Sequence, residues 1–269
     1  LINKYTEDKQ YRSVHDSESE EWKFNNIILP LISFTKYCVG YDFLESEKAV
    51  EKYLKYQHRY PKEYSKQFKI NINNLDLYNN IDNLDKIGLE IPSNTNVYIQ
   101  EYLKKKFENT KKIITITIRS QKYDKIRNSN ENDWLQFAQF LKNKNFEVVI
   151  IPDTDNAYSL DDKFKEFKIF HEGSFNLALR MGLYSNAFFN YFAGGGPSSL
   201  CTLHKSNKYI MFNYGPIEGS IVHTKESFEN FKEAPKEKFK FANKNQILIW
   251  EKDNYENMIK SYNKYILNE

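Results

Sequence analysis

Three consecutive glycines in the segment 192–200 are the residues of this chain best suited to bind an anion. The whole sequence has only 9 glycines, so a run of three followed by serines indicates a backbone requirement. Glycine tolerates positive φ and lets another group approach the main chain closely. Where such a loop follows a strand and opens a helix, its N–H groups and the helix dipole can bind phosphate. The residues concerned are Gly194, Gly195, Gly196, Ser198 and Ser199.

The same loop could instead be a tight turn that only connects a strand to a helix. It matches neither the dinucleotide-binding fingerprint nor the P-loop, so its spacing alone does not choose between the two interpretations. The residues at the ends of neighbouring strands therefore become important.

Polar residues also follow three other predicted strands, so that four strand ends carry groups able to bind a ligand. These residues are Arg119 and Ser120 after the strand 113–118, Asp153 and Asp155 after the strand 146–151, and Asn213 after the strand 209–212. Ligands of doubly wound parallel sheets bind outside the carboxyl ends of the strands. We therefore expect these side chains and the glycine loop to share one edge of the sheet.

Arg119 is the candidate to which we assign the central role. An arginine that ends an entirely apolar strand either clamps a phosphate through two hydrogen bonds or pairs with a buried carboxylate. Asp153 and Asp155 are the carboxylates with which such a structural pair would form. Both interpretations place the guanidinium at the carboxyl edge of the sheet.

Other polar residues each carry a functional and a structural interpretation. Arg127 and Asn128 either close over a ligand or cap the helix that begins nearby. Arg180 stands among apolar residues at a helical position, where it is a salt-bridge partner or a second phosphate-binding cation. Asp153 and Asp155 could act as a general base or hold sugar hydroxyls. Their spacing also permits a metal site, but no third ligand accompanies them, so we expect no metal.

The elements that must position these residues alternate between strand and helix from residue 109 to 269. Predicted strands are 113–118, 146–151, 167–170, 187–192, 209–212 and 246–250. Predicted helices are 134–141 with a polar cap region at 130–133, 174–183, 198–204, 226–231 and 254–266. Repeated β-α units require a parallel sheet with helices on both faces. The predicted fold class is therefore α/β, with a Rossmann-like doubly wound parallel sheet.

Residues 1–108 form a smaller, mainly helical N-terminal half, with the domain boundary at 108–110. Helices are predicted at 20–38, with a kink at Pro30, at 45–56 and at 96–107, and the Asn-rich segment 71–83 is predicted to be a loop. Few strand signals occur in this half, which leaves open that it is incomplete.

Composition excludes several classes of protein. A net charge of +3, from 39 basic and 36 acidic residues, argues against a dedicated nucleic-acid-binding protein. Cys38 and Cys201 provide neither a disulfide framework nor metal-ligand spacing, which fits a reducing, cytoplasmic compartment. The longest apolar run, 27–34, is far shorter than the ~18 residues of a membrane span. Peripheral contact with a membrane stays open.

Residues 110–215 resemble uncharacterised glycosyltransferase-like proteins of bacterial surface-polysaccharide clusters. The likeness rests on residues 116–119, 127–130, Trp134, 152–155, 176–181 and 196–201. Those proteins resemble the GT-B type, in which two Rossmann-like domains face each other and the C-terminal domain holds a nucleotide-sugar donor. Fucosyltransferase-like members carry an arginine after an early strand of that domain. The resemblance implies that Arg119 contacts the donor diphosphate and that residues 194–199 cradle it.

On this likeness we expect a metal-independent glycosyltransferase that transfers a hexosyl or deoxyhexosyl group without a cofactor. The donor is a nucleotide sugar, and the acceptor is a surface glycan or a lipid-linked glycan. Arg119 and the glycine loop would neutralise the leaving diphosphate. Asp153, Asp155 or a residue of the N-terminal half would deprotonate the acceptor hydroxyl. A nucleotide-sugar epimerase or hydrolase, or a non-catalytic nucleotide-sugar-binding module, remains an alternative on the same fold.

Overall fold

Six parallel strands form the centre of the computed structural model. The structure describes residues 24–35, 38, 40–42, 48, 88–107, 112–121, 124–154, 157–160, 162–221, 223–225, 228 and 237–267. The strands are β1 (Ile113–Thr117), β2 (Glu147–Ile151), β3 (Lys168–Ile169), β4 (Phe189–Ala193), β5 (Tyr209–Phe212) and β6 (Gln246–Leu248). They form one sheet in the order β3-β2-β1-β4-β5-β6.

Every pair of neighbouring strands in this sheet runs parallel. At the centre, Ile114 of β1 pairs with Val148 of β2 on one side and with Phe189 of β4 on the other. The strand order is that of doubly wound dinucleotide-binding folds, in which the order reverses between the two central strands. The predicted fold class, a Rossmann-like α/β sheet, is therefore confirmed, and the reversal lies between β1 and β4.

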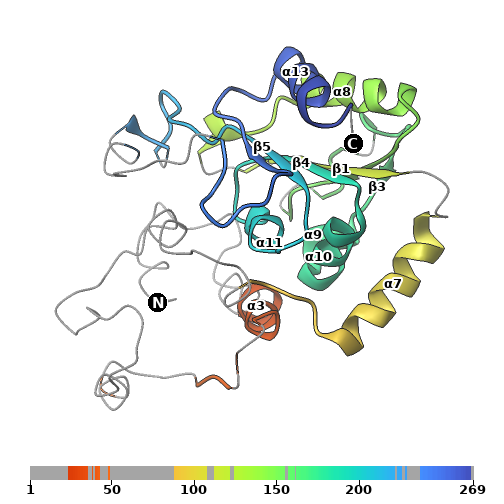
Figure 1. The fold of residues 1–269 in the computed structure, drawn as a ribbon, viewed down its shortest axis with the longest axis vertical. Helices are drawn as coiled ribbons and strands as arrows, with labels where there is room; N and C mark the ends of the chain where they lie inside the picture. The colour runs from red at the N-terminus through yellow and green to blue at the C-terminus, as the bar shows by residue number, and fades with distance from the viewer. Residues whose placement is uncertain are drawn as a thin grey trace.

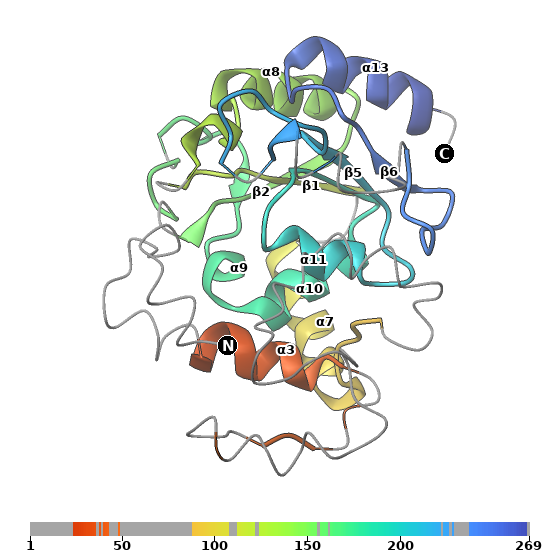
Figure 2. The same cartoon turned by 90° about the vertical axis from the view of Figure 1, so that its left-hand side faces the viewer.

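Helices cover both faces of the sheet (Figure 1). The helices are the π-helix η2 (Phe24–Ile28), α3 (Leu29–Ser33), α7 (Ser93–Phe107), the 3-10 helix η3 (Lys125–Arg127), α8 (Glu131–Asn143), α9 (Glu172–Phe175), α10 (Leu177–Asn186), α11 (Ser198–Thr202) and α13 (Tyr255–Tyr265). α8 and α13 lie on one side of the sheet, and α9, α10 and α11 lie on the other (Figure 2). α3 and α7 lie beyond α10 on that second side.

The alternation of side chains along β1 divides the core into two clusters. Ile114 and Ile116 pack with Trp134 of α8 and Met258 of α13 on one face. Ile113 belongs to the other cluster, with residues of α7 and α10. Successive residues of a strand point to opposite faces, so a continuous apolar run such as β1 requires a cover on both sides. The carboxyl end of β1 therefore lies between two layers of helices.

Helix α7 packs on α10 in the same cluster as one face of the sheet. Its buried residues Ile99 and Leu103 lie in that cluster with Met181 and Leu183 of α10. A Cβ at Gly182 would collide with the side chain of Ile99, so the absence of a side chain there lets the two helices approach. The sequence analysis predicts this helix as part of the N-terminal half. The domain boundary at 108–110 stays a prediction.

The predicted helix 20–38 is shorter and less regular in the structure. η2 leads into α3, which has Pro30 in its first turn and ends at Ser33. Thr35 then forms an antiparallel bridge with Leu89, a long-range contact that the local sequence does not reveal. Among the residues that the structure describes, no helix is long and apolar enough to cross a membrane.

The predicted helix 174–183 is divided into α9 and α10. Asn176 has an extended conformation (φ −117°, ψ 107°), and its side chain accepts a hydrogen bond from the N–H of Leu179. This is an N-cap, which ends one helix and starts the next. The predicted loop 71–83, and most of the predicted helices 45–56 and 226–231, lie outside the described residues.

Candidate functional site

The end of β1 and the end of β4 form the point at which the strand order reverses. From β1 the chain crosses toward β2, and from β4 it crosses toward β5, so the two connections diverge and leave a crevice. Arg119 follows β1, and Gly194 to Gly196 follow β4. A small pocket of about 20 Å³ lies here, lined by Thr117, Ile118, Arg119, Asp153, Arg180, Phe192, Ala193, Gly195, Pro197 and Ser198. The predicted convergence of Arg119, Asp153 and the glycine loop at one edge is therefore confirmed.

Two arginines approach two successive glycines of the loop. Nη2 of Arg127 donates to the carbonyl oxygen of Gly194 at 2.9 Å. Nη1 of Arg119 lies 3.4 Å from the position that a Cβ at Gly195 would occupy. Among the described glycines only Gly219 has a positive φ (81°), so none of the three loop glycines needs the left-handed region. The two glycines face the arginines, and a Cβ at Gly194 or Gly195 would lie 3.9 Å or 3.4 Å from the guanidinium groups, so neither positive φ nor a steric clash with an arginine accounts for these glycines.

The serines that follow the glycines close the loop as a turn. Ser198 N–H donates to the carbonyl of Gly195 at 3.0 Å, and Ser199 N–H donates to that of Gly196 at 3.1 Å. The hydroxyl of Ser198 also donates to the carbonyl of Gly195. These N–H groups are occupied within the turn, and α11 has only 5 residues. Positive charge at the loop therefore comes from the arginine side chains and not from these N–H groups. A phosphate-binding role for the two serines stays a prediction.

Arg127 closes over the glycine loop instead of capping α8. Its Nη1 lies 3.8 Å from Oδ2 of Asp124, and both side chains are buried. Oδ2 of Asp124 also accepts a hydrogen bond from the hydroxyl of Ser220 at 2.7 Å. The N-cap position of α8 is Asn130, whose side chain makes no capping hydrogen bond. Arg127 thus contacts the glycine loop and Asp124, and its predicted closure over a ligand stays a prediction.

Asn128 has a different environment from Arg127. Its amide nitrogen donates to the carbonyl of Gln121 at 2.9 Å, and its amide oxygen accepts from the N–H of Gln121 at 3.0 Å. These bonds close the loop between β1 and η3. A donor-binding role for Asn128 stays a prediction.

Arg180 lies deeper than the other two arginines, with a relative exposure of 1%. Its hydrogen-bond acceptors are main-chain carbonyl oxygens, of Gly173 through Nε and of Pro152 through Nη2 at 3.2 Å. Nη1 makes no hydrogen bond to another described residue. The side chain lines the same small pocket as Arg119. Its positive charge is therefore held at the site by carbonyl dipoles.

Asp153 connects the ends of β1 and β2. Its carboxylate accepts hydrogen bonds from the N–H of Ser120 at 3.1 Å, from Nε2 of Gln121 at 3.1 Å and from the N–H of Thr154 at 2.8 Å. These contacts orient the loop that carries Arg119. A role in deprotonating an acceptor stays a prediction for Asp153, and Asp155 lies outside the described residues.

The side chain of Asn213 belongs to a buried polar network. Its amide nitrogen donates to Oδ1 of Asp253 at 2.9 Å, and its amide oxygen accepts from the N–H of Asp253 at 3.1 Å. Oδ2 of Asp253 accepts from the indole N–H of Trp134 at 2.7 Å. Burial raises the pKa of Asp253, while its hydrogen bonds oppose the rise. Both polar atoms of the Asn213 amide thus bind Asp253, which connects the segment after β5 to the segment before α13 and to α8. Donor binding by Asn213 stays a prediction.

Arginine is scarce in this chain. The sequence has 39 basic residues, of which only Arg12, Arg59, Arg119, Arg127 and Arg180 are arginines. The three that lie in the described part of the chain all approach the ends of β1 and β4. Arginine differs from lysine in offering a planar fork of donors that matches phosphate geometry. All three arginines in the described part of the chain therefore belong to one site.

Sequence reasoning missed the contribution of Asp124, Ser220 and His223. They come from the loops that follow β1 and β5, and only the folded chain brings them together. Burial, followed by the positive charge of Arg127, lowers the pKa of His223 to about 4. None of the three stands at a spacing that indicates a site.

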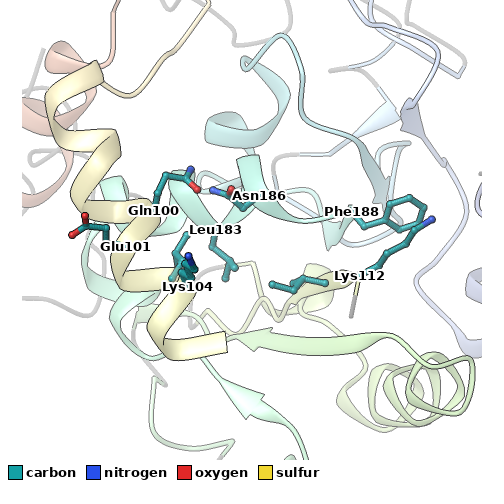
Figure 3. Close-up of a pocket in the computed structure, with 9 residues that line it drawn as sticks. Gln100, Glu101, Lys104, Lys112, Leu183, Asn186 and Phe188 are labelled. Carbon is teal, nitrogen blue, oxygen red and sulfur yellow. The ribbon is translucent and has the colours of Figure 1, made fainter. Parts of the chain in front are cut away.

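A second, larger pocket of about 400 Å³ lies at the opposite edge of the sheet (Figure 3). It is lined by Gln100, Glu101, Leu103, Lys104, Lys112, Ile113, Leu183, Asn186 and Phe188. Its floor is near the beginnings of β1 and β4, and the ammonium of Lys112 lies 4.0 Å from the ring centroid of Phe188. Ligands of doubly wound sheets bind at the carboxyl ends of the strands. We therefore place the candidate site at the smaller pocket, where the arginines and glycines meet.

Comparison with known proteins adds likenesses to glycosyltransferase structures. No protein-family model matches the sequence, and no curated protein matches it. A crystal structure of the glycosyl transferase family 9 from Veillonella parvula DSM 2008 has 14% identity and a TM-score of 0.46, covering 68% of this chain and 54% of that chain. E. coli heptosyltransferase WaaC with ADP-2-deoxy-2-fluoro heptose has 15% identity and a TM-score of 0.39, covering 62% and 47%. E. coli ADP-heptose lps heptosyltransferase II has 10% identity and a TM-score of 0.37, covering 52% and 44%.

This chain spans about half the length of each of these structures. Every TM-score is below 0.5, so the likenesses carry no argument about activity or substrate. The class of the protein rests on its own topology, a doubly wound parallel sheet with an arginine-flanked glycine loop at the reversal of strand order.

Proposed function

We propose that this protein is a glycosyltransferase of the GT-B type that binds the diphosphate of a nucleotide sugar at the ends of β1 and β4. The observation that carries the proposal is the approach of Arg119 to Gly195 and of Arg127 to Gly194 at the reversal of strand order. Two guanidinium groups beside a bare backbone offer several charge-assisted donors to phosphate oxygens without a Cβ in the way. The sequence resemblance implies the same role for Arg119 and for the loop 194–199.

In this proposal, the site stabilises a leaving group. In sugar transfer, the bond from the anomeric carbon to the diphosphate breaks while a bond to the acceptor oxygen forms, and the diphosphate leaves with more negative charge. Fixed cations aimed at that charge stabilise the transition state more than the ground state. Arg119, Arg127 and Arg180 would supply this charge, which is why we propose a reaction that needs no metal.

The small pocket would hold an oxygen-sized group rather than a whole nucleotide. Its volume is about 20 Å³, whereas ligand sites commonly enclose roughly 300 Å³ or more. Gly196 is exposed, and a Cβ added there would meet nothing within 4 Å. The nucleoside and the sugar would therefore extend outward over the edge of the sheet past this residue.

The acceptor hydroxyl would lose its proton to Asp153, to Asp155 or to a residue of the N-terminal half. Asp153 already accepts three hydrogen bonds, so as a base it would have to exchange one of them for the acceptor. The transfer would use a glycan or lipid-linked glycan acceptor. The sugar and the nucleobase of the donor are the first properties to determine.

The direct test is binding and turnover with a panel of UDP, GDP, ADP and CMP together with their sugar derivatives, with and without Mg²⁺. Isothermal titration calorimetry should show binding of one nucleotide class to the wild type. Arg119→Ala should weaken it by about 10- to 100-fold, because a charge-assisted pair is lost. Arg119→Lys should retain only part of the affinity, since lysine lacks the planar fork.

Lys105→Ala is the matched control, because this exposed lysine on α7 removes the same charge away from the site. Thermal melting without ligand should show that each variant is folded. Equal affinity of Arg119→Ala and the wild type for every nucleotide would refute the assignment. Consumption of donor without acceptor would indicate a hydrolase or an epimerase, and binding without turnover would indicate a binding module.

A further inference from the structure

Arg180 is a buried cation whose hydrogen-bond acceptors carry no negative charge. Its side chain has a relative exposure of 1%, and its acceptors are the carbonyl oxygens of Gly173 and Pro152. Within the described part of the chain it has no ion-pair partner, and Nη1 donates to no acceptor. The nearby hydroxyl of Tyr184 is hydrogen-bonded to that of Thr117 at 2.9 Å. Burying a charge is costly unless an opposite charge compensates it, so an anion at Nη1 would stabilise this side chain.

The small pocket at the ends of β1 and β4 has room for a single small ion. Its volume is about 20 Å³, and Arg180 lines it together with Ala193, Gly195 and Ser198. A cavity of roughly 10–15 Å³ is already enough for one water molecule. A chloride ion is only slightly larger than a water molecule, whereas a carboxylate with a carbon chain is much larger. The pocket therefore selects by size for a single-atom anion or for one projecting oxygen.

The charged residues that line the pocket leave an excess of one positive charge. They are Arg119, Arg180 and Asp153, two cations and one anion. The carboxylate of Asp153 accepts hydrogen bonds from two main-chain N–H groups and from an amide. Arg127, which contacts the glycine loop, has Asp124 as its partner at 3.8 Å. One monovalent anion in the pocket would thus balance its charge.

We propose that this pocket binds one halide ion, such as chloride, when no donor is present, and that a phosphate oxygen of the donor displaces it. Nη1 of Arg180 donates to the ion, and the guanidinium of Arg119 borders the same cavity. No covalent bond is made or broken. The displacement rests on the proposed function, whereas halide binding does not. Chloride thereby competes with the donor and lowers its apparent affinity.

The line width of the chloride NMR signal tests halide binding, because the quadrupolar chlorine nucleus relaxes rapidly when the ion is held in an asymmetric site. Wild-type protein should broaden the signal, and Arg180→Gln should remove most of this broadening. Lys105→Ala is the matched control, since it removes one positive charge from the exposed surface of α7. It should broaden the signal as the wild type does. Equal broadening by the wild type and a folded Arg180→Gln variant would overturn the inference.

A second variant keeps every charge of the site. Ala193 is buried and lines the pocket at the end of β4. Valine suits a strand, so Ala193→Val should preserve β4 while its additional methyl groups fill the cavity. This variant should also lose the broadening, and it carries the test alone if Arg180→Gln does not fold. Undiminished broadening by folded Ala193→Val would overturn the location of the ion.

Calorimetric titration with inorganic pyrophosphate tests the displacement. At constant ionic strength, replacing potassium gluconate by potassium chloride should weaken the apparent affinity of the wild type, because chloride fits the pocket and gluconate does not. The affinity should halve when the chloride concentration equals the dissociation constant of the ion. Ala193→Val should have the same affinity in both salts.

The outcomes separate this inference from the proposed function. Equal wild-type affinity for pyrophosphate in both salts, at chloride concentrations that broaden the NMR signal, overturns the displacement. Pyrophosphate that binds the wild type in neither salt overturns the proposed location of the diphosphate, while chloride broadening that depends on Arg180 would still establish the halide site. Absence of that broadening, with nucleotide binding that depends on Arg119, overturns the halide site alone.

Discussion

Nη2 of Arg127 donates to the carbonyl oxygen of Gly194 at 2.9 Å and so joins the loop after β1 to the loop after β4. These two loops belong to strands that lie next to each other in the sheet but are separated in sequence by β2 and β3. The bond crosses the crevice at the reversal of strand order. This hydrogen bond therefore connects the two loops that border the candidate site.

Larger side chains in the glycine loop should affect ligand binding unequally. An alanine Cβ at Gly195 would lie 3.4 Å from Nη1 of Arg119, an ordinary contact, so alanine should be tolerated. The additional methyl groups of Gly195→Val should displace the guanidinium and weaken pyrophosphate binding by about tenfold. Gly196→Val is the control, since a Cβ there meets nothing within 4 Å. Calorimetric titration of both variants checks this, and equal losses of affinity would count against the role of Arg119.

Gly182→Ala should destabilise the fold although alanine favours helices. Intrinsic propensity would stabilise the alanine variant by about 1 kcal/mol. The new Cβ would collide with Ile99 of α7, and overpacking typically costs about 1–3 kcal/mol. We expect a net loss in the free energy of unfolding, measured by urea denaturation. In the double variant, the effects of Gly182→Ala and Ile99→Ala on the free energy of unfolding should be non-additive. Additive effects would show that α7 does not pack there.

Asn213→Ala should act on stability and not on ligand affinity. It removes two hydrogen bonds to Asp253 and replaces a residue with φ 56°. Leaving buried polar groups of Asp253 unsatisfied should cost about 2–3 kcal/mol in the free energy of unfolding. Nucleotide affinity, measured at a temperature at which the variant is folded, should match that of the wild type. A selective loss of affinity would instead support the donor-binding role predicted from the sequence.

His223 should make the fold sensitive to acid. Its pKa is about 4 in the folded state, against about 6.5 for an unperturbed histidine, so the unfolded chain binds more protons between these values. Stability is then lost as the pH falls from about 6.5 to 4, by at most about 3 kcal/mol. His223→Gln should flatten the pH dependence in this window, as measured by urea denaturation at several pH values. Parallel curves for the two proteins would contradict the assigned pKa.

Local sequence was sufficient to predict the strands and the residues that leave them. The β-branched run of β1 and the apolar runs of β2 and β5 form strands because such side chains fit a sheet buried on both faces. In a parallel sheet all carboxyl ends share one edge, so Arg119, Asp153 and the glycine loop had to lie on the same side. Both conclusions depend on short-range patterns and on one rule of topology.

The tertiary structure decided which of these groups meet and what each one contacts. Placement of β4 beside β1 brings Gly195 to Arg119, and the turn of the next loop directs Arg127 onto Gly194. It also commits the amide of Asn213 to Asp253 and joins the main chain of His223 to Ser220, whose hydroxyl donates to Asp124. A strand order, a side-chain rotamer and the partner of a buried polar group depend on contacts between distant segments. The periodicity of a sequence contains no information on such contacts, whereas the packed sheet and its helices select one arrangement.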